Sequence, residues 1–139
     1  MPKSPDELAR EVIGLFAAIN RRYAQESESA ANAHELTPLQ VKALLAAEDP
    51  VPMRRIADHL RAEPSNVTAI IDRLESRGLV ERHPDPGDRR VKLVAATAAG
   101  RTVAADLRTR MPFAGAPLAR LTTEQRESLR ELLQLVLET

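Results

Sequence analysis

Two short helices separated by only three residues are the feature that most constrains this fold. Apolar residues recur at helical spacing over residues 53–60, and the next three residues, Arg61-Ala62-Glu63, form a predicted tight turn. Pro64 suits the first position of a second helix, which ends at Gly78, a residue that tolerates the left-handed backbone after a helix. Two helices joined by so short a turn indicate a helix-turn-helix unit.

A β-hairpin is predicted directly after the second helix. Leu79 to His83 and Val91 to Val94 have β-type patterns, and the strong turn sequence Pro84-Asp85-Pro86-Gly87-Asp88 lies between them. Helix, three-residue turn, helix and hairpin together are the plan of a winged helix-turn-helix, in which the second short helix enters the major groove of DNA. The sequence therefore predicts a mainly α-helical fold with a two-stranded β wing.

Four further helices are predicted around this unit. The first is long, because its apolar residues keep recurring every three or four positions. The helix that follows it begins with a capping box at Thr37 and Gln40 and stops at the stiff, proline-containing connection 49–52. The four predicted ranges are Asp6 to about Ala31, Thr37 to about Glu48, about Thr97 to Arg110, and Thr122 to Glu138, with Pro112, Gly115 and Pro117 separating the last two.

Length and composition fit one globular domain. The chain has 139 residues, 43% hydrophobic and 29% charged, which is long enough to bury a core but too short for two independent ones. It has no cysteine, so disulfides, thiolate metal sites and thiol redox sensing are excluded. The formal net charge of zero gives no information on whether the partner is a polyanion. Because the sequence has no membrane-spanning apolar run and no secretory signal, we expect a cytoplasmic protein.

Apolar stripes on both terminal segments predict a symmetric dimer. One small domain covers only part of these stripes, so we expect the ends of two chains to pack together, with folding back onto their own central module as the alternative. The single domain 1–139 then divides into a DNA-binding lobe, 36–96, and dimerisation helices, 5–32 and 97–139. The expected dimerisation residues are Leu8, Val12, Leu15, Phe16, Leu129, Leu132, Leu133 and Val136.

The second short helix carries polar side chains suited to DNA. Ser65, Asn66 and Thr68 lie opposite its apolar residues, and their amide and hydroxyl groups can hydrogen-bond to base edges or phosphates. The N-terminus of the helix also presents backbone amides to a phosphate. Residues of these types often do no more than cap a helix, and the sequence leaves both roles open for Ser65 and Asn66.

The predicted hairpin tip carries charges of both signs. Arginine is attracted to the negative potential of a narrow minor groove, so Arg89 and Arg90 predict a contact there. Asp88 is unusual beside phosphates unless it orients an arginine through a bidentate salt bridge, and we expect that role for it. An exposed charged turn without function is the alternative.

Five segments follow one another along the chain: 36–40 (LTPLQ), 56–60 (IADHL), 65–68 (SNVT), 73–82 (RLESRGLVER) and 88–90 (DRR). In order and spacing they resemble the successive signatures of the MarR family, and the match extends over about residues 8–138. The resemblance implies a homodimer that binds a near-palindromic duplex operator, usually as a repressor, and that is often released by small aromatic or anionic ligands. It also implies that Asp88 and Arg90 form the wing-tip pair and that Arg73 and Arg82 support backbone contacts or the wing. The expected DNA-binding residues are Thr37, Pro64, Ser65, Asn66, Thr68, Ala69, Arg73, Arg82, Asp88, Arg89 and Arg90.

The chain departs from the family pattern in two respects. Ala96 stands where the family usually has leucine, which predicts looser packing between the wing and the next helix. The cysteine that peroxide sensors of the family need is missing. One Tyr, two Phe and no Trp supply little aromatic stacking, and we expect any effector to bind between the dimerisation helices and the DNA-binding lobe.

Other classes of protein have less support from the sequence. His34, His59 and His83 lie in a loop, a helix and a strand, without the spacing of a hydrolase or zinc peptidase, so no catalytic residue, metal site or cofactor is predicted. A zinc-sensing regulator stays an alternative, because relatives of this kind exist. A winged helix used for protein contact is another, to which Asp72 and Glu75 would contribute, whereas the arginines of the same stretch favour DNA.

Overall fold

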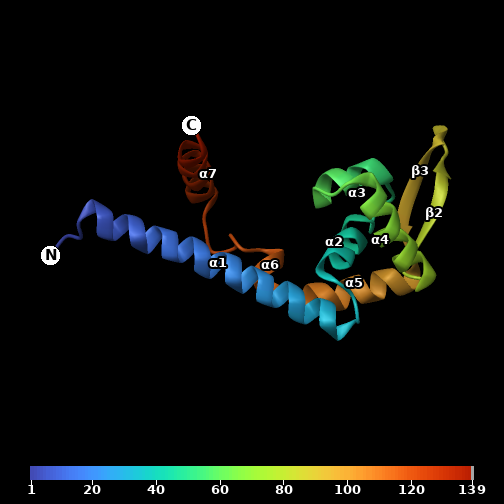
Figure 1. Ribbon diagram of the computed structural model, residues 1–139, viewed down its shortest axis with the longest axis horizontal. Coiled ribbons are helices and arrows are strands. Elements are labelled where there is room, and N and C mark those ends of the chain that lie inside the picture. The colour runs from blue at the N-terminus through green and yellow to red at the C-terminus, as the bar shows by residue number, and fades with distance from the viewer. Residues whose placement is uncertain (139) are drawn as a thin grey trace.

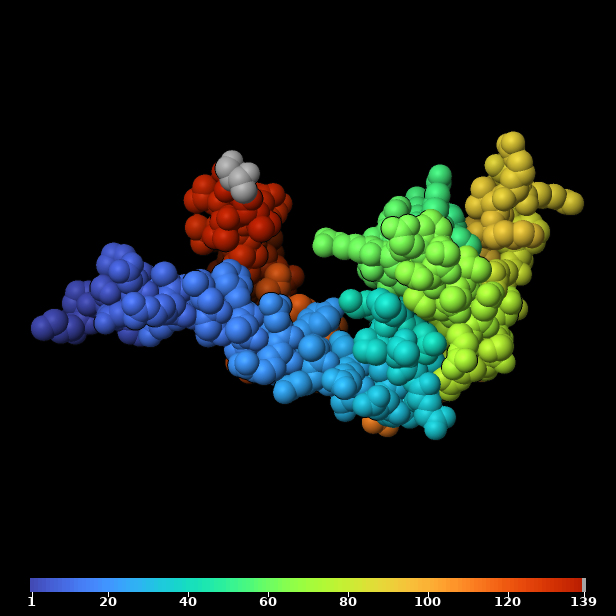
Figure 2. All heavy atoms as spheres, viewed as in Figure 1, coloured from blue at the N-terminus to red at the C-terminus, as the bar shows by residue number. Residues whose placement is uncertain are grey.

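The protein consists of a long helix, a lobe at one end of it, and a C-terminal helix that stands apart from the lobe (Figure 1). The computed structural model describes residues 1–138. Helix α1 (Pro5–Ala33) extends well beyond the lobe, and the space-filling view shows its N-terminal half standing apart from it (Figure 2). Over the described residues, no helix is long and apolar enough to cross a membrane.

Helix α1 begins with a local capping box and ends where it enters the lobe. At its start, Ser4 Oγ accepts a hydrogen bond from the Glu7 amide at 3.2 Å, and the Glu7 carboxylate accepts one from the Ser4 amide at 3.0 Å, which together form a capping box. Its only buried residues among those described are Ala30 and Ala31, where the helix enters the lobe. The N-terminal half of α1 is exposed and gains little from its own lobe, so its length follows from the continuous helical pattern of the sequence.

The lobe confirms the predicted helix-turn-helix and wing. Helices α2 (Pro38–Ala46), α3 (Met53–Leu60) and α4 (Pro64–Ser76) precede the hairpin, and α5 (Ala98–Arg110) follows it. Arg61 makes the turn between α3 and α4 in the left-handed region, with φ of 52°. One core joins all these elements, and its largest fully buried side chains are Leu44, Ile56, Val67, Ile71, Leu74, Val80, Val94 and Leu107.

The sheet has three strands, whereas the sequence predicted two. Strands β2 (Val80–Asp85) and β3 (Asp88–Ala96) form the wing, and the short β1 (Val51–Pro52) pairs antiparallel with β3 on its other side. The prediction treated these two residues as part of a stiff connection, because a strand so short has no alternating pattern and proline lacks an amide donor. β1 lies at the edge of the sheet, where one proline is tolerated.

The wing strands are also longer than predicted. Pro84, Asp85 and Asp88 belong to the ladder and not to the turn, although the register is irregular between Pro84 and Asp85. Arg89 and Arg90 therefore project from the first residues of β3. Cross-strand pairing extended the strands through residues whose local preference favours a turn.

The junction between the wing and α5 is tightly packed, contrary to the expectation from Ala96. Ala96 is 6% exposed, and its amide donates to the carbonyl oxygen of Ala47 at 2.7 Å. The Thr97 amide donates to the carbonyl oxygen of Leu79, and Gly100 of α5 lies directly against the same carbonyl group. A small residue at position 96 thus accompanies a close approach of backbone to backbone.

The C-terminal segment contains an additional short helix that the sequence did not predict. Helix α6 (Pro112–Gly115) precedes α7 (Thr123–Leu137), which begins as predicted with a capping box at Thr122 and Gln125. The Glu26 carboxylate of α1 accepts hydrogen bonds from the amides of Phe113 and Ala114, the latter at 2.8 Å. This cap comes from a residue far away in the sequence, which explains why local patterns missed α6. Thr139, part of the predicted dimerisation segment, lies outside the described residues.

We predict that Gly100→Ala destabilises the protein by about 1–3 kcal/mol, the usual cost of overpacking a well-packed site. A Cβ at this position would overlap the carbonyl oxygen of Leu79 and come within 2.9 Å of its carbonyl carbon, neither of which can move freely. Chemical unfolding followed by circular dichroism measures the effect. Gly115→Ala is the matched control, because its Cβ meets no described atom within 4 Å. Equal stability of the two variants would show that the junction is looser than described here.

Candidate nucleic-acid interface

The polar residues predicted for the second short helix lie on the exposed side of α4. Ser65, Asn66 and Thr68 are exposed, while the apolar residues of the same helix face the core. Within the described chain, the N-cap residue Glu63 forms no side-chain hydrogen bond to the helix. Ser65 and Asn66 follow Pro64 inside the first turn, so the alternative that they cap α4 is wrong.

At the tip of the wing, Asp88 orients Arg90, whose side chain stays exposed to solvent. The amide and Nε of Arg90 both donate to Asp88 Oδ1, at 3.1 and 3.2 Å, and the arginine side chain is 92% exposed. The expected ion pair is present, but a single carboxylate oxygen accepts both hydrogen bonds, instead of the bidentate geometry that was predicted. Asp88 therefore restrains the backbone and the Nε of Arg90 and leaves the two terminal nitrogens of the guanidinium available.

Arg82 joins the wing to α4. Its guanidinium pairs with Asp72 of α4 and lies 3.4 Å from Glu75 Oε1, and the hydrogen bond to Asp72 raises the pKa of Arg82. Asp72 and Glu75 had supported the alternative of a protein-contact surface. Since both carboxylates instead pair with Arg82, they neutralise a charge of the wing and set its position relative to α4.

The other predicted DNA-binding residues occupy different parts of the lobe. Ala69 and Arg73 are exposed on α4, and Arg89 is exposed beside Arg90 on β3. Thr37 acts as the N-cap of α2: its hydroxyl accepts from the Gln40 amide at 3.1 Å. It borders a groove that it shares with residues of α1, so the structure does not bring it to the polar face of α4.

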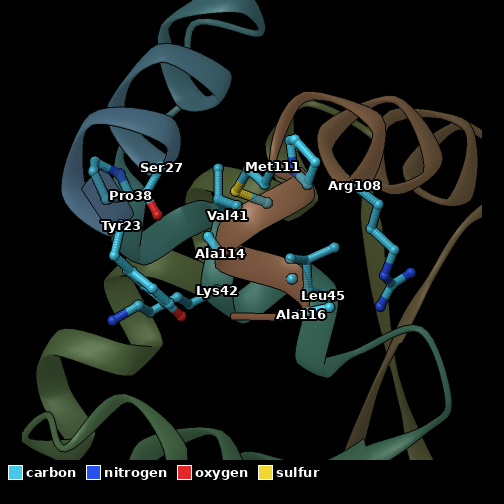
Figure 3. A pocket seen from close by; sticks show the side chains of 12 residues that line it. Tyr23, Ser27, Pro38, Val41, Lys42, Leu45, Arg108, Met111, Ala114 and Ala116 are labelled. Atoms are coloured by element: carbon cyan, nitrogen blue, oxygen red, sulfur yellow. The ribbon is translucent and has the colours of Figure 1, made fainter. Parts of the chain in front are cut away.

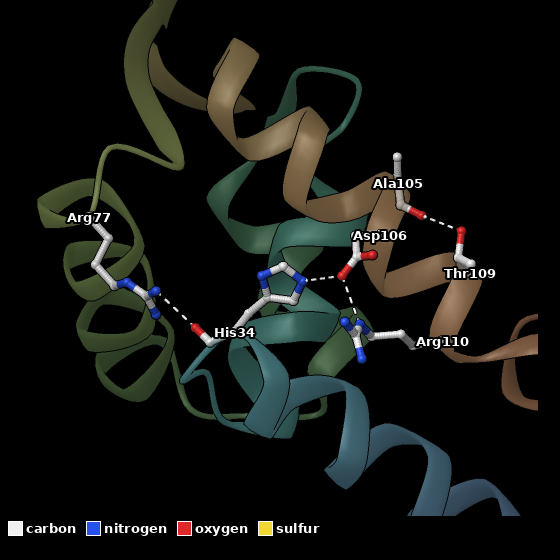
Figure 4. A network of polar contacts seen from close by, with 6 residues as sticks. All are labelled: His34, Arg77, Ala105, Asp106, Thr109 and Arg110. Atoms are coloured by element: carbon white, nitrogen blue, oxygen red, sulfur yellow. Dashed lines mark hydrogen bonds and ion pairs between the residues drawn. The ribbon is translucent and has the colours of Figure 1, made fainter.

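Arg77 is a connecting residue whose role the sequence did not reveal. From the end of α4, its guanidinium donates to the carbonyl oxygens of His34, at 2.8 Å, and Glu35, at 3.0 Å, in the turn after α1 (Figure 4). The His34 ring in turn lies 2.6 Å from Asp106 Oδ2 of α5, and Arg110 Nε donates to the same oxygen at 2.8 Å. This network fixes the end of α1 to both α4 and α5.

A cavity of about 440 Å³ lies between the long helix and the lobe (Figure 3). Its wall is largely apolar, and Lys42 and Arg108 are the charged residues among those that line it. In Figure 3, Tyr23 and Lys42 lie on one side and Arg108 on the other. The lining residues are Tyr23, Ser27, Pro38, Val41, Lys42, Leu45, Arg108, Met111, Pro112, Ala114, Gly115 and Ala116. Tyr23, the single tyrosine of the chain, therefore offers an aromatic contact to a molecule bound in this cavity.

Residues 1–138 contain no cluster of three or more histidine, aspartate or glutamate side chains placed to hold a metal ion. The three histidines belong to separate regions: His34 follows α1, His59 lies on α3 and His83 lies on β2.

Comparison with known proteins places this arrangement in a family. The sequence profile of the MarR family matches residues 36–92, the part of the chain that forms the helix-turn-helix and most of the wing. An uncharacterised HTH-type transcriptional regulator of Mycobacterium leprae, ML2140, is 32% identical over 104 residues, which are 74% of this chain and 73% of that protein. The chain belongs to the MarR family. It is a DNA-binding transcriptional regulator and not an enzyme, as the sequence predicted.

Two further relatives extend the comparison of this MarR-family protein. The HTH-type transcriptional repressor NicR of Pseudomonas putida is 29% identical over 103 residues, 72% of this chain and 65% of NicR. The crystal structure of CouR from Rhodococcus jostii, bound to p-coumaroyl-CoA, superposes with a TM-score of 0.73 at 28% identity and covers 93% of both chains. The similarity to CouR includes the terminal helices that the family profile leaves out.

We predict that Asp106→Asn flattens the acid side of the stability profile. Hydrogen bonds from Arg110 and then His34 lower the pKa of Asp106 in the folded state. Its ionised form therefore stabilises the fold above the ordinary carboxyl pKa, and this contribution is lost as pH falls through the lowered value, below about pH 4. Urea unfolding between pH 3 and 7 should show a smaller loss of stability on acidification for the variant than for the wild type. Glu81→Gln, which neutralises an exposed carboxylate of β2, is the control; equal slopes for all three proteins would contradict the role of Asp106.

Proposed function

We propose that this MarR-family regulator acts as a homodimeric, sequence-specific repressor that a small molecule releases from its operator. The observation that carries the proposal is that one lobe combines two features. The start of α4 carries exposed polar side chains that are not used to cap the helix, and the wing tip carries an exposed arginine that Asp88 orients. The repressor activity of NicR supports the direction of regulation. Two such lobes in a dimer would place two copies of α4 in successive major grooves of a near-palindromic site.

The proposed base contacts come from α4, and the proposed minor-groove contact comes from the wing. Ser65, Asn66 and Thr68 face outward at the start of the helix, where short side chains reach base edges. Arg90 extends from β3 and, with its Nε held by Asp88, can place its terminal nitrogens in the minor groove. Arg82 contributes indirectly, because it sets the angle between the wing and α4.

The proposed dimer interface consists of the terminal helices. Leu8 of α1 is 54% exposed, and Leu132 and Val136 of α7 are 60% and 70% exposed. These side chains have not folded back onto their own lobe, which was the alternative, and stripes this apolar need cover by another chain. Val12, Leu15 and Phe16 continue the stripe on α1, while Leu129 and Leu133 of α7 are partly buried.

The cavity between α1 and the lobe is the proposed effector site. It contacts α1, α2 and α5, so a ligand there would touch both the proposed dimerisation helix and the DNA-binding lobe. The complex of CouR with p-coumaroyl-CoA supports a ligand that is apolar over part of its length. A ligand that prefers one relative position of these elements would change the spacing of the two copies of α4 and weaken operator binding.

A mobility-shift assay with the DNA upstream of the protein's own gene tests the proposal, with unrelated DNA as competitor. We expect saturable, competitor-resistant binding that weakens steeply with salt, because neutralised phosphates release counterions. Arg90→Ala removes one arginine from each of the two wings, and each loss should weaken binding about tenfold, or 1.4 kcal/mol, and lower the slope of log affinity against log salt by about 0.9. Arg120→Ala, an exposed arginine between α6 and α7, is the control. Unchanged binding by Arg90→Ala would refute the wing contact, and competitor-sensitive binding by the wild type would refute sequence-specific recognition of this DNA.

The dimer is tested separately by Leu132→Glu. A charge in the middle of the exposed stripe should convert the dimer to a monomer, because a glutamate buried in the interface would lack a partner. Sedimentation velocity measures the mass, and circular dichroism checks that the helices remain. Leu39→Glu is the matched control, since Leu39 is also an exposed leucine, at 43%, but lies on α2. A dimer that survives Leu132→Glu would move the interface away from α7.

A further inference from the structure

A second cavity, of about 480 Å³, lies where α2, β1, α3 and α5 meet. It is open to solvent, and three of its six lining residues carry basic side chains. The described residues that line it include no acidic one. They are Leu45, Ala46, Val51, Arg55, His59 and Arg108.

The basic groups reach this cavity from two different helices. Arg55 and His59 are four residues apart on α3, so they lie one above the other on the same exposed face. Arg108 comes from α5 and also pairs with Glu48, in the loop between α2 and β1. Donors that converge from two elements surround an anion better than neighbours on one helix, because they approach it from different directions.

The second cavity adjoins the first one. Leu45 and Arg108 line both, so the two spaces adjoin at the end of α2 and the C-terminal part of α5. The first cavity offers mainly apolar contacts, from residues such as Val41 and Met111, whereas the second offers guanidinium and imidazole groups. A single ligand that spans both would be apolar at one end and anionic at the other.

We propose that Arg55, His59 and Arg108 bind a phosphate group, the anionic end of a ligand whose apolar end occupies the first cavity. A phosphate carries between one and two negative charges near neutral pH and presents three free oxygens, which matches three donors. Arginine suits such a group because its planar fork donates two parallel hydrogen bonds. The assignment of the apolar end rests on the proposed effector function, but the phosphate site itself does not.

Occupation of this site would act on the DNA-binding lobe. A phosphate held by α3 and α5 together links the first helix of the helix-turn-helix to the helix that follows the wing. It also competes with Glu48 for Arg108, and Glu48 belongs to the loop that leads into β1 and α3. Because α3 packs directly on α4, a shift of α3 would be passed to the polar face of α4.

Pyrophosphate is the probe for the test, and the three histidines of the chain provide the readout. In protein with ¹³C-labelled histidine, titration at constant pH and ionic strength should move the ring signals of His59 saturably. The signals of His34 and His83 should stay in place, since one lies after α1 and the other on the wing. Equal movement of the His83 signals would indicate unspecific attraction of anions to basic surface, and no movement of His59 would mean no site; either result overturns the proposal.

Variants assign the donors and separate this site from DNA. Arg55→Gln and Arg108→Gln should each weaken the pyrophosphate response of His59 about tenfold, as expected for loss of a charged hydrogen bond, while Arg120→Gln should not. An undiminished response in both variants would overturn the assignment.

If the pocket instead received a backbone phosphate of DNA, Arg55→Gln would lower the affinity for the operator as strongly as Arg90→Ala does, and that result would also overturn the proposal. Failure of operator binding in the wild type would leave the histidine readout unaffected, so the two proposals fail separately.

Discussion

The burial of one side of α4 determines how the rest of the lobe is arranged. Val67, Ile71 and Leu74 are 0–1% exposed and anchor the helix against a core that also includes residues of α2, α3 and the wing. With 3.6 residues per turn, burying these positions forces Ser65, Asn66 and Thr68 outward. The same hydrophobic contact that stabilises the fold therefore selects the surface available for DNA.

Around this core, arginines that bind other parts of the chain differ in role from an arginine whose terminal nitrogens stay free. Arg82 and Arg77 each satisfy partners within the chain: Arg82 pairs with carboxylates of α4, and Arg77 donates to carbonyl oxygens at the end of α1. They hold the wing, α4 and α1 in fixed relation. Arg90 pairs with Asp88 only through its Nε, and its side chain stays exposed. In a DNA-binding protein, the first kind sets geometry and the second kind is free to meet phosphates or bases.

The two cavities lie between elements of the fold that pack against each other. One separates α1 from the lobe, and the other separates α5 from the first helix of the helix-turn-helix. Arg108 lines both and is held by Glu48, so it connects the two spaces to the loop before β1. A ligand in either cavity would therefore contact elements whose relative positions set the spacing of the two copies of α4 in a dimer.

The sequence by itself determined the order of the main helices, the helix-turn-helix, the hairpin and the outward face of α4, because these follow from local periodicity, capping boxes and turn residues. Only the tertiary structure decided the third strand, the helix α6, the length of the wing and the partners of Arg77 and Arg82. β1 depends on a cross-strand pair with β3, and α6 depends on a cap from Glu26. Contacts between residues far apart in sequence leave no local pattern, since each partner alone is compatible with many other neighbours.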